Sequence, residues 1–147
     1  MAWLGCLRRY LIVLAGGNLA WEALHMPLYS LWETGTYRQM VVYGLHCLAG
    51  DLLIGMSALV MALLIFGNRG WPVGGYMRVA TWALAFGFGY TVWSEWYNVQ
   101  IAGSWAYSEW MPVIPGFGVG VSPLLQWIVV PALGFGWVRR WLQGRER

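Results

Sequence analysis

The sequence predicts an all-α membrane protein: an antiparallel bundle of four transmembrane helices with an aromatic-rich outer loop. Of its 147 residues, 59% are hydrophobic and only 10% are charged, whereas a soluble domain carries about 25% charged residues. Four long apolar segments follow one another, and the arginines gather on one side of them. We therefore expect one integral membrane domain, residues 1–147, whose surroundings are the lipid bilayer. The net charge of +3 is small and dispersed, so no nucleic-acid partner is expected.

The four apolar segments are the expected spans, and they cover residues 9–32, 39–66, 79–99 and 123–141. Each has about 19–28 residues, which at about 1.5 Å per residue is enough to cross a hydrocarbon core of about 30 Å. A cleaved signal peptide is the rival interpretation of the first segment, because Arg8 and Arg9 precede its apolar run. The apolar character continues as far as Trp32, which favours a span.

Local signals in the sequence agree with these boundaries. Ser122 is a good helix cap, and Pro123 suits the first helical position because its missing N–H is not needed there. Pro27 and Pro131 fall inside the first and fourth segments, where proline removes a backbone donor. We expect both helices to kink at these residues.

The arginines predict the orientation of the bundle. Cytoplasmic loops of membrane proteins carry an excess of positive charge. Only Arg38 lies on the outer side, and eight of the nine basic residues lie on the other: Arg8, Arg9, Arg69, Arg78, Arg139, Arg140, Arg145 and Arg147. We therefore expect a protein of the bacterial cytoplasmic (inner) membrane with both termini in the cytoplasm.

Ionisable side chains within the apolar segments are the most informative feature for function. Glu22 and His25 lie in the first segment, His46 and Asp51 in the second, and Glu95 near the end of the third. A charge at the membrane centre costs about 2.5–3.5 kcal/mol, so such a residue normally has a partner and often a function. Counted from the flanking arginines at about 1.5 Å per residue, all except His46 fall within a band about 7 Å deep. We expect them to meet in one site below the outer surface.

Metal binding is the leading functional interpretation of this site. Glu22 and His25 have the Glu-x-x-His spacing of carboxylate-bridged di-metal bundles, although the motif occurs only once. The candidate ligands are Glu22, His25, His46, Asp51 and Glu95, with Cys47 and Met26 as weaker candidates. Imidazole with sulfur ligands suits copper, and imidazole with carboxylates suits zinc or iron. Haem between His25 and His46 is less favoured, because their expected heights differ by about 10 Å.

Three other interpretations stay open. In the first, the polar groups pair only with one another and fix the packing of the helices. Alternatively, the chain is a non-catalytic accessory or assembly subunit of a larger membrane complex of the respiratory type. Such a subunit would dock through the outer loop between Gln100 and Ser122, whose tryptophans suit an interface. The third is a membrane enzyme that uses Glu22 or Glu95 as a general acid or base.

Several common functional motifs are absent from the sequence. It contains no phosphate-binding Gly-x-x-x-x-Gly-Lys loop, no Gly-x-Ser-x-Gly elbow and no Cys-x-x-Cys pair. Cys6 and Cys47 are expected at opposite membrane faces, too far apart for a disulfide. The glycines at positions 16, 17, 87 and 89 instead suit close approach of neighbouring helices.

Overall fold

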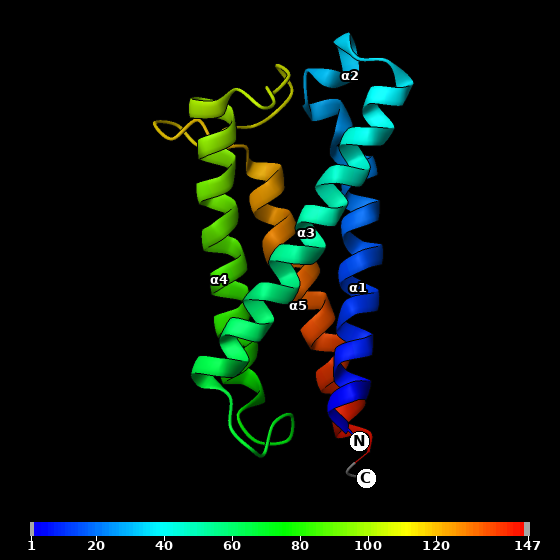
Figure 1. The fold of residues 1–147 in the computed structure, drawn as a ribbon, viewed down its shortest axis with the longest axis vertical. Coiled ribbons are helices and arrows are strands. Elements are labelled where there is room, and N and C mark those ends of the chain that lie inside the picture. The colour runs from blue at the N-terminus through cyan, green and yellow to red at the C-terminus, as the bar shows by residue number, and fades with distance from the viewer. Residues whose placement is uncertain (1, 146–147) are drawn as a thin grey trace.

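The computed structural model describes residues 2–145, which are all-helical and contain no β-strand. Its long helices are α1 (Ala2–His25), α3 (Tyr37–Phe66), α4 (Tyr76–Trp96) and α5 (Val121–Gln143). Successive long helices run in opposite directions, and both chain ends lie at one end of the bundle, which we call the terminal end (Figure 1). The opposite end, called the loop end, holds the turn Met26–Leu28, the short helix α2 (Leu31–Thr34) and the π-helical turn Tyr97–Ala102. The all-α class predicted from the sequence is thus confirmed.

Two of the long helices, α3 and α5, are long and apolar enough to cross a membrane. Helices α1 and α4 have 24 and 21 residues but do not meet the same hydropathy criterion. Polar residues lower the hydropathy of α1, and tryptophan and tyrosine, which favour membrane interfaces, lower that of α4.

The observed helix ends differ from the sequence expectation mainly in the first segment. Helix α1 ends at His25 rather than continuing to residue 32, and Pro27 lies in a three-residue 3-10 turn. The expected kink of a continuous helix at Pro27 is therefore wrong, because the chain turns there instead. Helix α3 begins close to the expected position, where Thr36 and Gln39 form a capping box that satisfies two backbone N–H groups.

The terminal end of the bundle has an apolar core. The residues buried there are Cys6, Tyr10, Leu14, Leu59, Ala62, Val79, Ala80, Ala83, Val130, Phe135 and Val138. Helix α3 crosses the bundle obliquely (Figure 1), and its buried residues all lie between Gly55 and Ala62. None of residues 37–54 is buried. Helix α3 therefore packs most closely at the terminal end and is less buried at the loop end.

Candidate functional site

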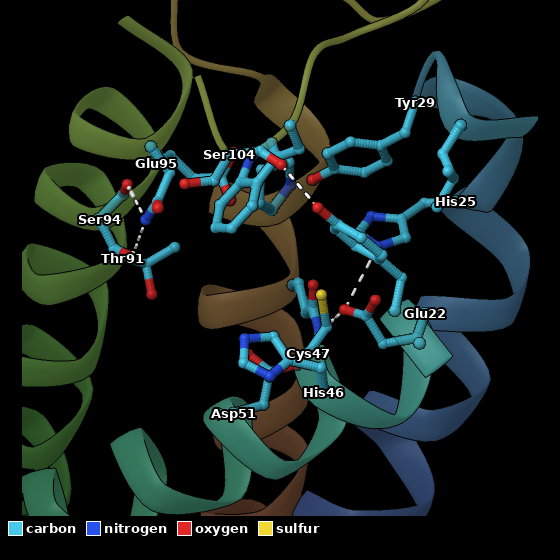
Figure 2. A pocket seen from close by; sticks show the side chains of 18 of the residues that line it. Glu22, His25, Tyr29, His46, Cys47, Asp51, Thr91, Ser94, Glu95 and Ser104 are labelled. Atoms are coloured by element: carbon cyan, nitrogen blue, oxygen red, sulfur yellow. Dashed lines mark hydrogen bonds and ion pairs between the residues drawn. The ribbon is translucent and has the colours of Figure 1, made fainter. Parts of the chain in front are cut away.

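A cavity of about 580 Å³ lies in the loop-end half of the bundle, between α1, α3, α4 and α5. Glu22 and His25 on α1 face Glu95 on α4 across it (Figure 2). Its wall includes all of the sequence-derived metal candidates: Glu22, His25, Met26, His46, Cys47, Asp51 and Glu95. It also includes the aromatic side chains Tyr29, Tyr43, Tyr90, Trp105 and Trp127. A volume of this size is within the range of about 300–1,000 Å³ that small-molecule sites occupy.

The imidazole of His25 is held on both of its nitrogens. His25 Nε2 lies 3.3 Å from Glu22 Oε1, and His25 Nδ1 lies 3.0 Å from Ser122 Oγ. The Trp21 indole N–H donates to the same Ser122 oxygen over 3.2 Å, which leaves the serine hydroxyl hydrogen free to donate to Nδ1. We infer that Nε2 carries the ring proton and that this N–H donates a hydrogen bond to Glu22 Oε1. Ser122 does not line the cavity, so its role is to orient the imidazole.

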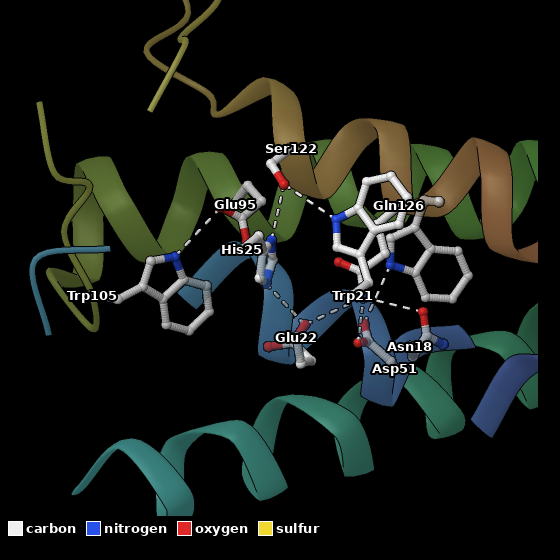
Figure 3. Close-up of polar contacts among 10 residues, drawn as sticks. Asn18, Trp21, Glu22, His25, Asp51, Glu95, Trp105, Ser122 and Gln126 are labelled. Atoms are coloured by element: carbon white, nitrogen blue, oxygen red, sulfur yellow. Dashed lines mark hydrogen bonds and ion pairs between the residues drawn. The ribbon is translucent and has the colours of Figure 1, made fainter. Parts of the chain in front are cut away.

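Gln126 on α5 links three polar side chains from α1 and α3 (Figure 3). Its Nε2 lies 3.1 Å from Asn18 Oδ1, 3.2 Å from Glu22 Oε1 and 2.9 Å from Asp51 Oδ2. Trp127 Nε1 donates to the other oxygen of Asp51 over 3.3 Å. Two carboxyl groups thus converge on one amide nitrogen. Because like charges this close repel, the pair favours a shared proton or a bound cation.

Glu95 occupies the opposite wall and receives its donors from the loop between α4 and α5. Its Oε2 accepts a hydrogen bond from Trp105 Nε1 over 3.4 Å and one from the Tyr107 hydroxyl. Burial, reinforced by the Glu95 carboxyl, raises the pKa of Tyr107 above its usual range, so the phenol keeps its proton and donates. Tyr107 Oη in turn accepts the Gly120 N–H over 2.9 Å. These bonds tie the position of Glu95 to the loop that follows it.

The loop of residues 103–120 packs against the segment that follows α1. An antiparallel bridge joins Tyr107 to Tyr29. The Ser30 N–H donates to the Ala106 carbonyl over 2.9 Å. Ser104, Trp105 and Ala106 contribute to the cavity wall. The loop therefore packs over part of the cavity at the loop end.

His46 and Cys47 line the cavity but take no part in this hydrogen-bond network. His46 lies on the exposed loop-end half of α3. Among residues 2–145, no group of three or more His, Cys, Asp or Glu side chains is arranged to hold a metal ion. Ligation by His25 would also require one of its two hydrogen bonds to break. Copper, zinc or iron binding by these residues stays a prediction.

Sequence reasoning missed Gln126 and misassigned Ser122. Gln126 is only 2% exposed and lies in the apolar sequence of α5. A polar amide within an apolar segment was the signal that could have identified it. Ser122 was expected to cap the fourth helix, but α5 begins at Val121 after Gly120 and has no side-chain cap. The serine hydroxyl contacts Trp21 and His25 instead.

Comparison of the chain with protein-family models, with curated proteins and with solved structures finds no match. Function is therefore inferred from the cavity and its lining residues.

Proposed function

We propose that this chain is a four-span protein of the bacterial cytoplasmic membrane that binds a small amphiphilic molecule in its outward half. The observation that carries the proposal is the cavity itself. Carboxyl groups and an imidazole occupy part of its wall, and apolar and aromatic side chains occupy the rest. Pockets of this kind bind ligands through apolar contact and use a few polar groups to orient them.

The lengths and outer surfaces of α1 and α4 support four spans. With 24 and 21 residues, these helices are about 36 and 32 Å long, enough for a hydrocarbon core of about 30 Å. Large apolar side chains are exposed on both helices: Leu4, Ile12, Leu19 and Leu24 on α1, and Met77, Trp82 and Trp93 on α4. Lipid is the solvent that suits such faces.

Thiol labelling tests this topology. In a chain carrying Cys6→Ala and Cys47→Ala, we expect a membrane-impermeant maleimide to label Glu109→Cys in intact spheroplasts. Arg69→Cys should be labelled only after the cells are lysed, because the α3–α4 connection lies at the terminal end with both chain ends. Equal labelling of both positions in intact spheroplasts would contradict the four-span arrangement.

Two glutamates each offer one free oxygen to a bound molecule. The contacts of Glu22 all involve Oε1 and those of Glu95 all involve Oε2. Among residues 2–145, no N–H donor and no Ser, Thr or Tyr hydroxyl reaches the second oxygen of either carboxyl. Such an oxygen accepts a hydrogen bond from a ligand, and it is also the position from which Glu22 would exchange a proton with that ligand.

Filling the cavity from Gly50 is the direct test of ligand binding. Gly50 lines the cavity, and a Cβ atom there would meet no other atom within 4 Å. We expect Gly50→Phe to occupy the binding space without disturbing the fold. Wild-type protein purified in mild detergent should release a bound small molecule that solvent extraction and mass spectrometry detect, and this variant should have lost it.

Gly89→Phe is the matched control. Gly89 is an exposed helical glycine whose Cβ would also meet nothing within 4 Å, but it does not line the cavity. Equal recovery of the molecule from both variants would argue against the proposal. Stoichiometric copper, zinc or iron in the same samples, lost with His25→Ala, would favour a metal site instead.

The exposed tip of the outer loop favours a second candidate function, that of an accessory subunit of a larger membrane complex. Trp110 and Phe117 at this tip are 69% and 66% exposed, and tryptophan is a frequent anchor of protein interfaces. We expect the tagged protein to co-purify with other membrane subunits, and Trp110→Ser with Phe117→Ser to abolish this. Recovery of the wild type as a free protein from mildly solubilised membranes would contradict this role.

A further inference from the structure

We propose that the ligand of this cavity is a basic amphiphile, a molecule with an ammonium group and an apolar chain, that enters from the lipid between α3 and α4. This inference rests on the ligand-binding function proposed above and adds the chemical class and the route of entry. Four observations carry it: the charge of the cavity wall, the kind of donors that its acids receive, its aromatic side chains, and the place where it reaches the molecular surface.

The cavity wall has an excess of acidic groups. It contains Glu22, Asp51 and Glu95 but no arginine and no lysine. Among residues 2–145, the one close contact between a basic side chain and a carboxyl group joins His25 Nε2 to Glu22 Oε1, at 3.3 Å. The wall thus holds three carboxyl groups and two imidazoles, those of His25 and His46, and fixed positive charge is what the site lacks. A bound ammonium group would supply it.

The donors already present do not neutralise these acids. Asp51 accepts hydrogen bonds on both oxygens, from the Gln126 amide and the Trp127 indole. Glu95 accepts from an indole and a phenol. Neutral donors stabilise a carboxylate through hydrogen bonding and leave its net charge unchanged. The acids therefore still need a shared proton or a bound cation to balance their charge.

Aromatic side chains stand among these acids. Tyr29, Tyr90, Trp105 and Trp127 line the same cavity. The faces of aromatic rings attract ammonium groups, and aromatic cages of this kind recognise quaternary and substituted ammonium ligands. Acidic and aromatic groups together favour an organic cation over an inorganic one, which agrees with the absence of a three-residue metal cluster in residues 2–145.

The cavity reaches the molecular surface between α3 and α4. Leu53 on α3 and Tyr90 on α4 both line it, and they are 68% and 48% exposed. Exposed residues also line the cavity at the loop end, among them Thr34, Tyr43 and Ser104, where residues 103–120 pack over part of it. In the proposed topology the surface between α3 and α4 faces lipid, so a molecule dissolved in the outer leaflet reaches the acids sideways while its apolar chain stays near Leu53.

Three probes with the same C12 chain test the ligand class: N,N-dimethyldodecylamine, 1-dodecanol and dodecanoate. The full chain is placed in nanodiscs of zwitterionic phosphatidylcholine, and empty nanodiscs correct for partitioning. Binding is measured by native mass spectrometry near neutral pH. We expect the amine to bind at least tenfold more tightly than the alcohol, and the carboxylate to bind more weakly than either.

Variants assign the selectivity to the acids. Glu95→Gln and Asp51→Asn should each reduce amine affinity at least tenfold and alcohol affinity much less, and circular dichroism checks that each variant is folded. Gly50→Phe should abolish binding of both probes, and Gly89→Phe should leave both intact. Equal binding of amine and alcohol by the wild type would overturn the inference.

The outcomes separate this inference from the function on which it rests. If the alcohol binds as well as the amine and Gly50→Phe blocks both, a ligand site exists but its preference for a basic group is wrong. If no probe binds the wild type and Gly50→Phe has no effect on co-purified molecules, the ligand-binding function itself fails.

Discussion

Replacement of Gln126 with leucine is expected to lower the free energy of unfolding by about 3 kcal/mol. Gln126 is 2% exposed, and its amide nitrogen contacts Asn18, Glu22 and Asp51. Leucine has a similar size but no donor, so these buried oxygens would lose their shared partner. Leaving a buried polar group unsatisfied costs about 1–3 kcal/mol, and more for a charged group. Thermal unfolding in detergent, followed by circular dichroism, measures the change.

Gln143→Leu is the matched control for this prediction. Gln143 is the last residue of α5, and its side chain is exposed. The same chemical change there should alter stability by no more than about 0.5 kcal/mol, as expected of a surface substitution. If the two variants unfold at the same temperature, Gln126 does not hold the polar network together.

Replacement of Gly87 with valine is expected to destabilise the protein by about 3 kcal/mol and to weaken ligand binding. A Cβ atom at Gly87 would lie 2.5 Å from Cζ3 of the Trp127 indole. That indole is 3% exposed, lines the cavity and donates to Asp51, so its displacement would disturb the site. Overpacking of a close-packed interior typically costs about 1–3 kcal/mol.

Gly89→Val makes the same change two residues further along α4. Nothing lies within 4 Å of a Cβ atom at Gly89, so we expect a change of no more than about 0.5 kcal/mol and unaltered binding. Thermal unfolding and the extraction assay described for Gly50→Phe measure both effects. Similar losses in both variants would show that helix conformation, rather than contact with Trp127, is responsible.

The sequence by itself determined the helical class and most helix boundaries. The expected segments 39–66 and 123–141 correspond to Tyr37–Phe66 and Val121–Gln143, because apolar composition and end signals such as the Thr36–Gln39 capping box act locally. It failed after His25, where the apolar residues that follow form turns. Hydropathy reports that a segment is apolar, and it does not distinguish a helix from a turn that packs against a loop.

Tertiary structure alone decided which glycines matter. The sequence pointed equally to Gly16 and Gly17, and equally to Gly87 and Gly89. A Cβ atom at Gly17 would meet Val130 at 2.8 Å and one at Gly87 would meet Trp127, whereas Gly16 and Gly89 face open space. The difference depends on how each helix is rotated toward its neighbours, and this rotation is set by packing between segments far apart in the chain.

For the candidate site too, the sequence predicted one part and tertiary packing decided the other. The sequence predicted similar depths for Glu22, His25, Asp51 and Glu95 because the rise of a helix is constant, and these residues do line one cavity. The sequence did not predict the hydrogen-bond partners of these residues. Gln126 lies 104 positions from Glu22, and Ser122 lies 97 from His25. Only the packing of α5 against α1 brings these pairs within hydrogen-bond distance, since contact between distant segments depends on how helices assemble rather than on any local pattern.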